Sequence, residues 1–159
     1  MGVDSNEEVL VYRWLLRALE LGIISGFDYQ PCTFDLTPAV KYYVGKKQRT
    51  LFREHRYSPD FLIYLKPEYA ELYSEFKVVT DGKIYIDVKG TFNQTARSFS
   101  IDQKLVYQKY GYYVYKLIPK EFMRKFGILE DFRFTRKTRK PSRVFDGYRT
   151  IEEVFGKSK

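Results

Sequence analysis

Two aspartates and a lysine are the residues whose types and spacing point most directly to chemistry. Asp87 and Lys89 come at the end of the apolar run 84–88, and Asp60 follows Pro59 at the start of another apolar segment. Because successive side chains of a strand point to opposite faces, Asp87 and Lys89 share one face while the apolar residues share the other. With Asp60 on a neighbouring strand, two carboxylates can hold a hard divalent cation through oxygen, and the lysine can lie beside a phosphate.

The order Pro59-Asp60, then Asp87-Val88-Lys89-Gly90, resembles the motif of the PD-(D/E)xK nuclease superfamily. The resemblance implies that Asp60, Asp87 and the Val88 carbonyl bind magnesium, for which manganese can substitute. It implies that Lys89 orients or deprotonates the attacking water, or stabilises charge on the phosphate. The gap from Asp60 to Asp87 is longer than the family's usual interval, and we interpret it as a hairpin that turns at 80–83. The alternative is a surface Asp–Lys pair at the end of that hairpin.

Glu8 is the candidate for a further acid in the site. Ser5 and Glu8 have the spacing of a capping box and predict a helix over 5–24. Glu8 falls at the edge of the apolar face of this helix, so its carboxylate points toward the body of the protein. The text Ser5-x-x-Glu8-x-x-x-Tyr12 resembles the opening of phage-encoded and transposon-encoded nucleases of this type, in which such a glutamate completes the metal site. Glu7 is the reserve candidate, and the alternative role for Glu8 is helix capping alone.

Further strands and helices must position these groups. Apolar patterns predict strands at 28–36, 40–44 and 57–65, a hairpin of 76–80 with 83–89, and a last core strand at 112–117. Helices are predicted at 99–110 and 119–126. The order of these elements resembles the superfamily's αβββαβ core. We therefore expect an α/β fold with a restriction-endonuclease-like core, a central mixed β-sheet flanked by helices. The core is assigned to 1–128 and a basic extension, packed on the core or extending from it, to 129–159.

Gln103 is a further candidate site residue on the helix predicted at 99–110. Gln103 and Tyr107 lie four residues apart and so share a helix face. Their Gln-x-x-x-Tyr spacing is similar to a motif of RecB-type members of the superfamily, in which the glutamine supports the catalytic site. Lys104 is the alternative polar contact at this position.

The charge of the chain favours a nucleic-acid partner. The 159 residues carry a net charge of +8, and 18% of them are aromatic. Cations bind phosphates and rings stack on bases, although a basic solvated surface over an aromatic core has the same composition. Six of the eleven residues in 133–143 are basic, a run that binds phosphate backbones or only aids solubility. The candidate DNA contacts in this run are Arg136, Lys137, Arg139, Lys140 and Arg143. Arg97, in the loop predicted after Gly90, is a further candidate, and the alternative is that this loop is an ordinary surface loop.

Composition also excludes several classes of function. One cysteine, Cys32, and one histidine, His55, allow no disulfide framework and no Cys/His zinc cluster within the chain. The chain has no Walker-type phosphate loop and therefore encodes no ATP-driven motor. It has no apolar run long enough to cross a membrane and no signal-peptide pattern at the start. We expect a cytoplasmic protein, located in the host cell if the gene is carried by a phage.

These features together predict a magnesium-dependent DNA endonuclease that processes phage or mobile-element DNA. Small basic enzymes of this kind often resolve branched DNA such as Holliday junctions during recombination, which requires two active sites and hence a homodimer. One alternative is a non-catalytic nucleic-acid-binding module, which the intact set of Glu8, Asp60, Asp87 and Lys89 disfavours. The other is a phage assembly protein, which would neither bind metal nor cleave DNA.

Overall fold

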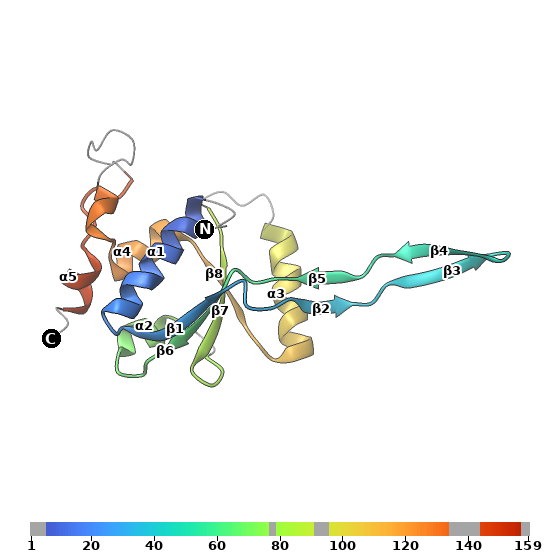
Figure 1. Ribbon diagram of the computed structural model, residues 1–159, viewed down its shortest axis with the longest axis horizontal. Coiled ribbons are helices and arrows are strands. Elements are labelled where there is room, and N and C mark those ends of the chain that lie inside the picture. The colour runs from blue at the N-terminus through green and yellow to red at the C-terminus, as the bar shows by residue number, and fades with distance from the viewer. Residues whose placement is uncertain (1–5, 77–78, 91–95, 134–143, 157–159) are drawn as a thin grey trace.

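A four-stranded mixed sheet forms the centre of the protein (Figure 1). The computed structural model describes residues 6–76, 79–90, 96–133 and 144–156. The strands β1 (Ile24–Tyr29), β6 (Phe61–Leu65) and β7 (Lys83–Val88) are antiparallel, and β8 (Val114–Leu117) runs parallel to β7. The expectation of an α/β protein with a mixed central sheet and flanking helices is therefore confirmed.

The main core lies between this sheet and helix α1 (Asn6–Glu20). Helix α1 buries Val11, Trp14, Leu15 and Ala18, which recur at helical spacing on one face. The predicted end at residue 24 is wrong, because Gly22 takes a positive φ of 76° and Ile24 already begins β1. Helix α4 (Pro119–Phe126), which has the predicted bounds, packs against α1.

A second core lies on the opposite face of the sheet, under helix α3 (Ala96–Tyr110). It joins α3 to a two-stranded ribbon of β2 (Phe34–Thr37) and β5 (His55–Tyr57). Its buried members are Phe34, Leu36, Tyr57, Phe99, Val106 and Val114. The two cores confirm the predicted alternation of β7: Ile84, Ile86 and Val88 belong to the main core, whereas Tyr85 packs on the second. Helix α3 begins three residues earlier than predicted, and β8 begins two residues later.

A long hairpin extends from the second core into solvent. Strands β3 (Val40–Val44) and β4 (Lys47–Phe52) form a ribbon that projects beyond α3, away from α1, α4 and α5 (Figure 1). The predicted strand at 40–44 is confirmed. The single strand predicted at 28–36 is wrong, because β1 ends at Tyr29, Gln30 takes a φ of 48°, and the chain starts again as β2 at Phe34. The segment predicted as one strand over 57–65 is likewise divided between β5 and β6.

The long interval between Asp60 and Asp87 contains a helix, and its described residues, 60–76 and 79–87, form no long hairpin. Helix α2 (Ala70–Glu75) follows β6, and Phe76 and Val79 lie outside any strand. In the part of the predicted hairpin that the structure describes, the two segments pair only at the tight turn Thr80–Lys83, which has positive φ at Asp81 and Gly82. The hairpin prediction is therefore wrong, and α2 accounts for the extra length.

The described part of the 129–159 extension packs on the main core. The 3₁₀ helix η1 (Glu130–Arg133) and helix α5 (Ile151–Phe155) contribute Phe132 and Ile151, and the segment before α5 contributes Phe145. Thr150 caps α5 and forms a β-bridge with Ile128. Each helix in the described ranges is too short or too polar to cross a membrane.

Gly127 allows this close approach and gives a stability prediction. Its φ is 94°, and a Cβ added there would lie 2.6 Å from backbone atoms of Thr150 and Ile151. Gly147 has a similar φ of 80°, but an added Cβ meets nothing within 4 Å. We expect Gly147→Ala to cost about 1–2 kcal/mol of unfolding free energy from backbone strain alone. Gly127→Ala should cost about 1–3 kcal/mol more from the forced overlap. Urea unfolding of both variants measures the difference, and equal losses would contradict the docking of α5.

Candidate active site

Four predicted residues gather at one end of the central strands. Asp87 is the penultimate residue of β7, Lys89 follows that strand, and Asp60 immediately precedes β6. Glu8 lies in the first turn of α1. Glu8 and Asp87 are only 8% and 4% exposed, so the fold buries two acids that ordinarily remain in water. The charges of Glu8, Asp87 and Lys89 all act on Asp60, and we call these four residues the acidic cluster.

Asp87 is at the centre of the cluster. Lys89 Nζ lies 2.7 Å from Asp87 Oδ1, and the Tyr57 hydroxyl donates a hydrogen bond to Oδ2. Oδ1 is buried and, among the described residues, accepts no properly oriented hydrogen bond in addition to this ion pair. Lys89 is three-quarters buried, with Nζ 5.6 Å from the centre of the Phe99 ring. A buried carboxylate oxygen without an oriented hydrogen bond requires an explanation, and a bound cation is one that its chemistry allows.

Asp60 is tied to β7 through the backbone. Its Oδ2 accepts a hydrogen bond of 2.7 Å from Val88 N–H, and its own N–H donates to the Ile86 carbonyl at 2.9 Å. Burial raises the pKa of the Asp60 carboxyl to about 7, and the charges of Asp87 and Glu8 act in the same direction. The Val88 N–H and Lys89 oppose this rise. Asp60 therefore gains or loses a proton near neutral pH.

Both N-terminal glutamates reach this end of the sheet. Tyr29 OH donates to Glu8 Oε1 at 3.2 Å, and Gln30 Nε2 donates to the Tyr29 oxygen at 3.2 Å. Glu7 lies against the residue after Lys89, since a Cβ added to Gly90 would come within 3.2 Å of Glu7 Oε1. Glu8 thus faces the sheet, as its position on the helix predicts, and Glu7 lies at the rim of the cluster.

Tyr57 is the site residue that sequence reasoning missed. It ends β5, and its ring packs in the second core at 6.3 Å from Phe99. Burial, followed by the charge of Asp87, raises the pKa of its hydroxyl, which therefore stays protonated and donates to Asp87. The only signal in the sequence is its position directly before Ser58-Pro59-Asp60, and residue type alone does not distinguish it among 15 tyrosines.

The remaining candidates lie apart from the cluster or outside the described chain. Gln103 Nε2 donates to the Val114 carbonyl at 2.7 Å, and so fastens α3 to the start of β8. Arg97 is exposed in the first turn of α3. Within the described contacts neither residue reaches Asp60, Asp87 or Lys89. The other candidate DNA contacts, Arg136, Lys137, Arg139, Lys140 and Arg143, lie outside the described residues.

The carboxylate oxygens of Glu8, Asp60 and Asp87 are ligands that suit a hard cation, although they are not already arranged around one metal position. The described residues contain no group of three His, Cys, Asp or Glu side chains already spaced to hold a metal ion. Lys89 Nζ is itself a cation beside Asp87 Oδ1, and the pKa of Asp60 is raised partly by neighbouring acids. A divalent cation would relieve both the repulsion among the acids and the burial of their charge, and such oxygen ligands suit magnesium. In donor chemistry, though not in their present spacing, the residues fit the magnesium that the sequence predicts.

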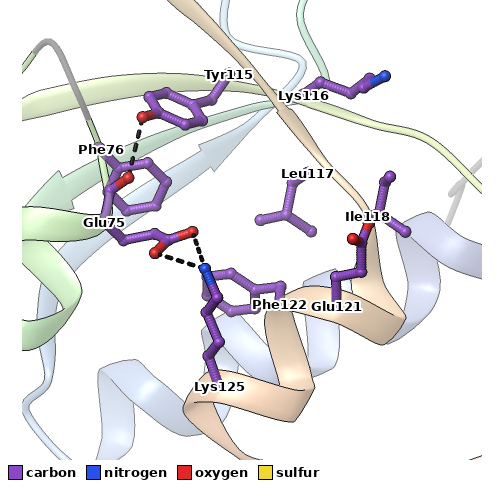
Figure 2. Close-up of a pocket in the computed structure, with 9 residues that line it drawn as sticks. All are labelled: Glu75, Phe76, Tyr115, Lys116, Leu117, Ile118, Glu121, Phe122 and Lys125. Carbon is purple, nitrogen blue, oxygen red and sulfur yellow. Dashed lines mark hydrogen bonds and ion pairs between the residues drawn. The ribbon is translucent and has the colours of Figure 1, made fainter.

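A separate pocket lies among α2, β8 and α4. Figure 2 shows Lys125 paired with Glu75 across its mouth, at 3.1 Å, and Tyr115 OH donating to the Glu75 carbonyl at 3.0 Å. Phe76, Leu117 and Phe122 line its apolar side. None of the four clustered residues lines this pocket, and we assign it no ligand.

The raised pKa of Asp60 predicts that this residue destabilises the metal-free protein at high pH. Because the folded state binds the proton more tightly than the unfolded state, stability falls as pH rises from about 4 to about 7. Asp60→Asn keeps an acceptor for Val88 N–H but removes the charge. Unfolding free energies of Asp60→Asn and the unmodified protein are compared in EDTA. We expect the change caused by the substitution to be more stabilising at about pH 8 than at about pH 5, by on the order of 2 kcal/mol. Thermal melts across this range test it, and a pH-independent difference would contradict the raised pKa.

Comparison of the chain with models of protein families, with curated proteins and with solved structures finds no match.

Proposed function

We propose that this protein is a magnesium-dependent DNA endonuclease with a restriction-endonuclease-like core of the PD-(D/E)xK type. The observation that carries the proposal is the buried ion pair of Asp87 and Lys89 at the end of β7. Asp60 and Glu8 are the other charged residues of the same cluster. The order α1, β1, β6, β7, α3, β8, with the last strand parallel to its neighbour, supports it because it resembles the αβββαβ core predicted from the sequence. A surface Asp–Lys pair would lie in solvent, whereas Asp87 is buried.

The acids would hold the metal ion. Asp60, Asp87 and Glu8 supply carboxylate oxygens, and the Val88 carbonyl at the same strand end is a further candidate. When bound, magnesium lowers the pKa of a coordinated water and polarises the phosphate. Tyr57 is a positioning residue in this scheme, because its hydroxyl fixes one oxygen of Asp87.

Lys89 would act on the reacting phosphate. Phe99 and Asp87 hold its side chain at the end of β7 in a partly buried environment. A positive charge fixed in such surroundings stabilises the negative charge that develops on the phosphate more strongly than the same charge in water. With a metal ion bound, Asp87 would be neutralised without Lys89, and the ammonium group of Lys89 would be available to the substrate.

Cleavage of labelled four-way junction, flap, linear duplex and single-stranded DNA tests the proposal. Each DNA is incubated with the protein and magnesium, manganese or EDTA. We expect metal-dependent cutting, and the preferred DNA will assign the role in phage or mobile-element DNA processing. Sedimentation of the protein with a junction tests whether two copies act together. Binding of these DNAs without cutting in either metal would overturn the enzymatic proposal and leave a nucleic-acid-binding module.

A further inference from the structure

The hairpin of β3 and β4, residues 40–52, contributes no residue to the proposed chemistry. We call it the arm. Every residue of both strands is exposed, on both faces of the ribbon. Its exposed side chains include large rings, with Tyr43 68% and Phe52 62% exposed. A two-stranded ribbon with neither face packed gains little stability from burial. We therefore expect a ribbon of this length to bind a partner.

The charge of the arm indicates the chemistry of that partner. Residues 40–52 contain no acid and four basic residues, Lys41, Lys46, Lys47 and Arg49. Paired residues of an antiparallel ribbon share a face, so Tyr42 lies beside Arg49 and Val44 beside Lys47 on one side. On the other side Lys41 Nζ donates to Thr50 Oγ1 at 2.7 Å. Cations therefore occur on both faces.

The base of the arm is fixed to the body of the protein. Strands β2 and β5 continue the arm and pack on α3 through the second core. Lys109 Nζ and Tyr110 OH both donate to the Asp35 carbonyl at 2.8 Å, and His55 Nε2 lies 2.6 Å from Asp102 Oδ1. These interactions come from α3, so the arm is anchored to a helix.

The arm also leads directly to the acidic cluster. Strand β5, which continues β4, ends at Tyr57, whose hydroxyl donates to Asp87, and Asp60 follows three residues later. A long ligand bound along the arm would thus be directed toward the buried acids. The charge and the dimensions of the arm indicate what that ligand is.

We propose that the arm is a binding element for duplex DNA, its cations contacting phosphates while the ribbon lies along a groove. This inference rests on the proposed function, from which it takes DNA as the ligand. The five residues of β3 span about 17 Å, and a two-stranded ribbon fits the major groove of B-DNA. A second copy of the chain is a poorer occupant, because the centres of protein interfaces are depleted in lysine, whereas each face of the arm carries basic residues.

Two variants with equal reduction of charge test the arm. The first replaces Lys46, Lys47 and Arg49 with glutamine, and the second replaces Lys120, Arg124 and Arg149 with glutamine, exposed residues of α4 and of the segment before α5. Each triple change lowers the net charge from +8 to +5. Binding of a labelled linear duplex is measured by fluorescence anisotropy in EDTA over a series of salt concentrations. Sedimentation of both variants records their association state.

We expect the arm variant to bind the duplex about tenfold or more weakly at low salt. The slope of its salt dependence should fall by about 0.9 for each phosphate that the arm no longer neutralises. The control variant should bind within a few-fold of the unmodified protein. If both variants lost the same amount of duplex affinity, net charge alone would explain the binding, and the proposal would be overturned. Unchanged DNA binding combined with a lower association state in the arm variant would assign the arm to the interface between copies.

The experiment separates this inference from the proposed function because binding in EDTA requires no cleavage. A protein that binds duplex through the arm but never cuts DNA with metal would fail only as a nuclease. A protein that cuts DNA while the arm variant binds normally would fail only in the role given to the arm.

Discussion

Asp87→Asn is expected to abolish metal-dependent DNA cleavage, lowering kcat by more than about 10³-fold. Asparagine has the shape of aspartate and can still accept the Tyr57 hydrogen bond, so the fold is kept. The charge at the buried end of β7 is removed, and with it the attraction for a divalent cation. Single-turnover cleavage of the preferred DNA at saturating magnesium measures the rate.

A thermal shift separates loss of metal binding from loss of chemistry alone. A metal that binds only the folded state stabilises it by about 2.7 kcal/mol at a concentration of 100 times its Kd. We expect the unmodified protein to show this stabilisation and Asp87→Asn to lose it. Asp28→Asn is the matched control, because Asp28 on β1 is an exposed acid that accepts a hydrogen bond from Tyr64 OH at 3.1 Å. Metal-dependent cleavage by Asp87→Asn at the normal rate would exclude Asp87 as a ligand.

The sequence predicted the central part of the candidate site because it depends on local geometry. The period of two in a strand decides that Asp87 and Lys89 share a face while Ile84, Ile86 and Val88 enter the main core. The structure has this arrangement, with the two charged groups 2.7 Å apart. The position of Glu8 follows in the same way from the helical period, which places it at the edge of the apolar face.

Features that depend on long-range pairing were not predictable. Tyr57 reaches Asp87 only because β5 pairs with β2 and packs on α3, and no spacing in the sequence encodes that pairing. The division of one apparent strand into β1 and β2 at Gln30 is different, because Pro31, which cannot donate a ladder hydrogen bond, was a local signal that the prediction overlooked. Helix α2 was missed because the segment 67–75 is polar and aromatic and shows no clear period.

A prediction for Lys89 distinguishes its role from that of the acids. Lys89→Met keeps the packing of the side-chain stem on Phe99 but removes the ammonium group beside Asp87. We expect the cleavage rate to fall by about 10²–10³-fold, the range seen when a fixed group that stabilises developing charge is removed.

Metal binding should not fall together with the cleavage rate. Lys89 Nζ competes with a divalent cation for Asp87 Oδ1, so its removal should leave the metal-induced thermal shift unchanged or increase it at about pH 8, where Asp60 is largely ionised. Lys83→Met is the control, because Lys83 begins the same strand and its Nζ lies 5.6 Å from the Tyr64 ring centre. If Lys89→Met lost rate and metal affinity together, Lys89 would be needed to hold the acids in place. A slow enzyme that binds metal as well as the unmodified protein would place Lys89 in the chemical step.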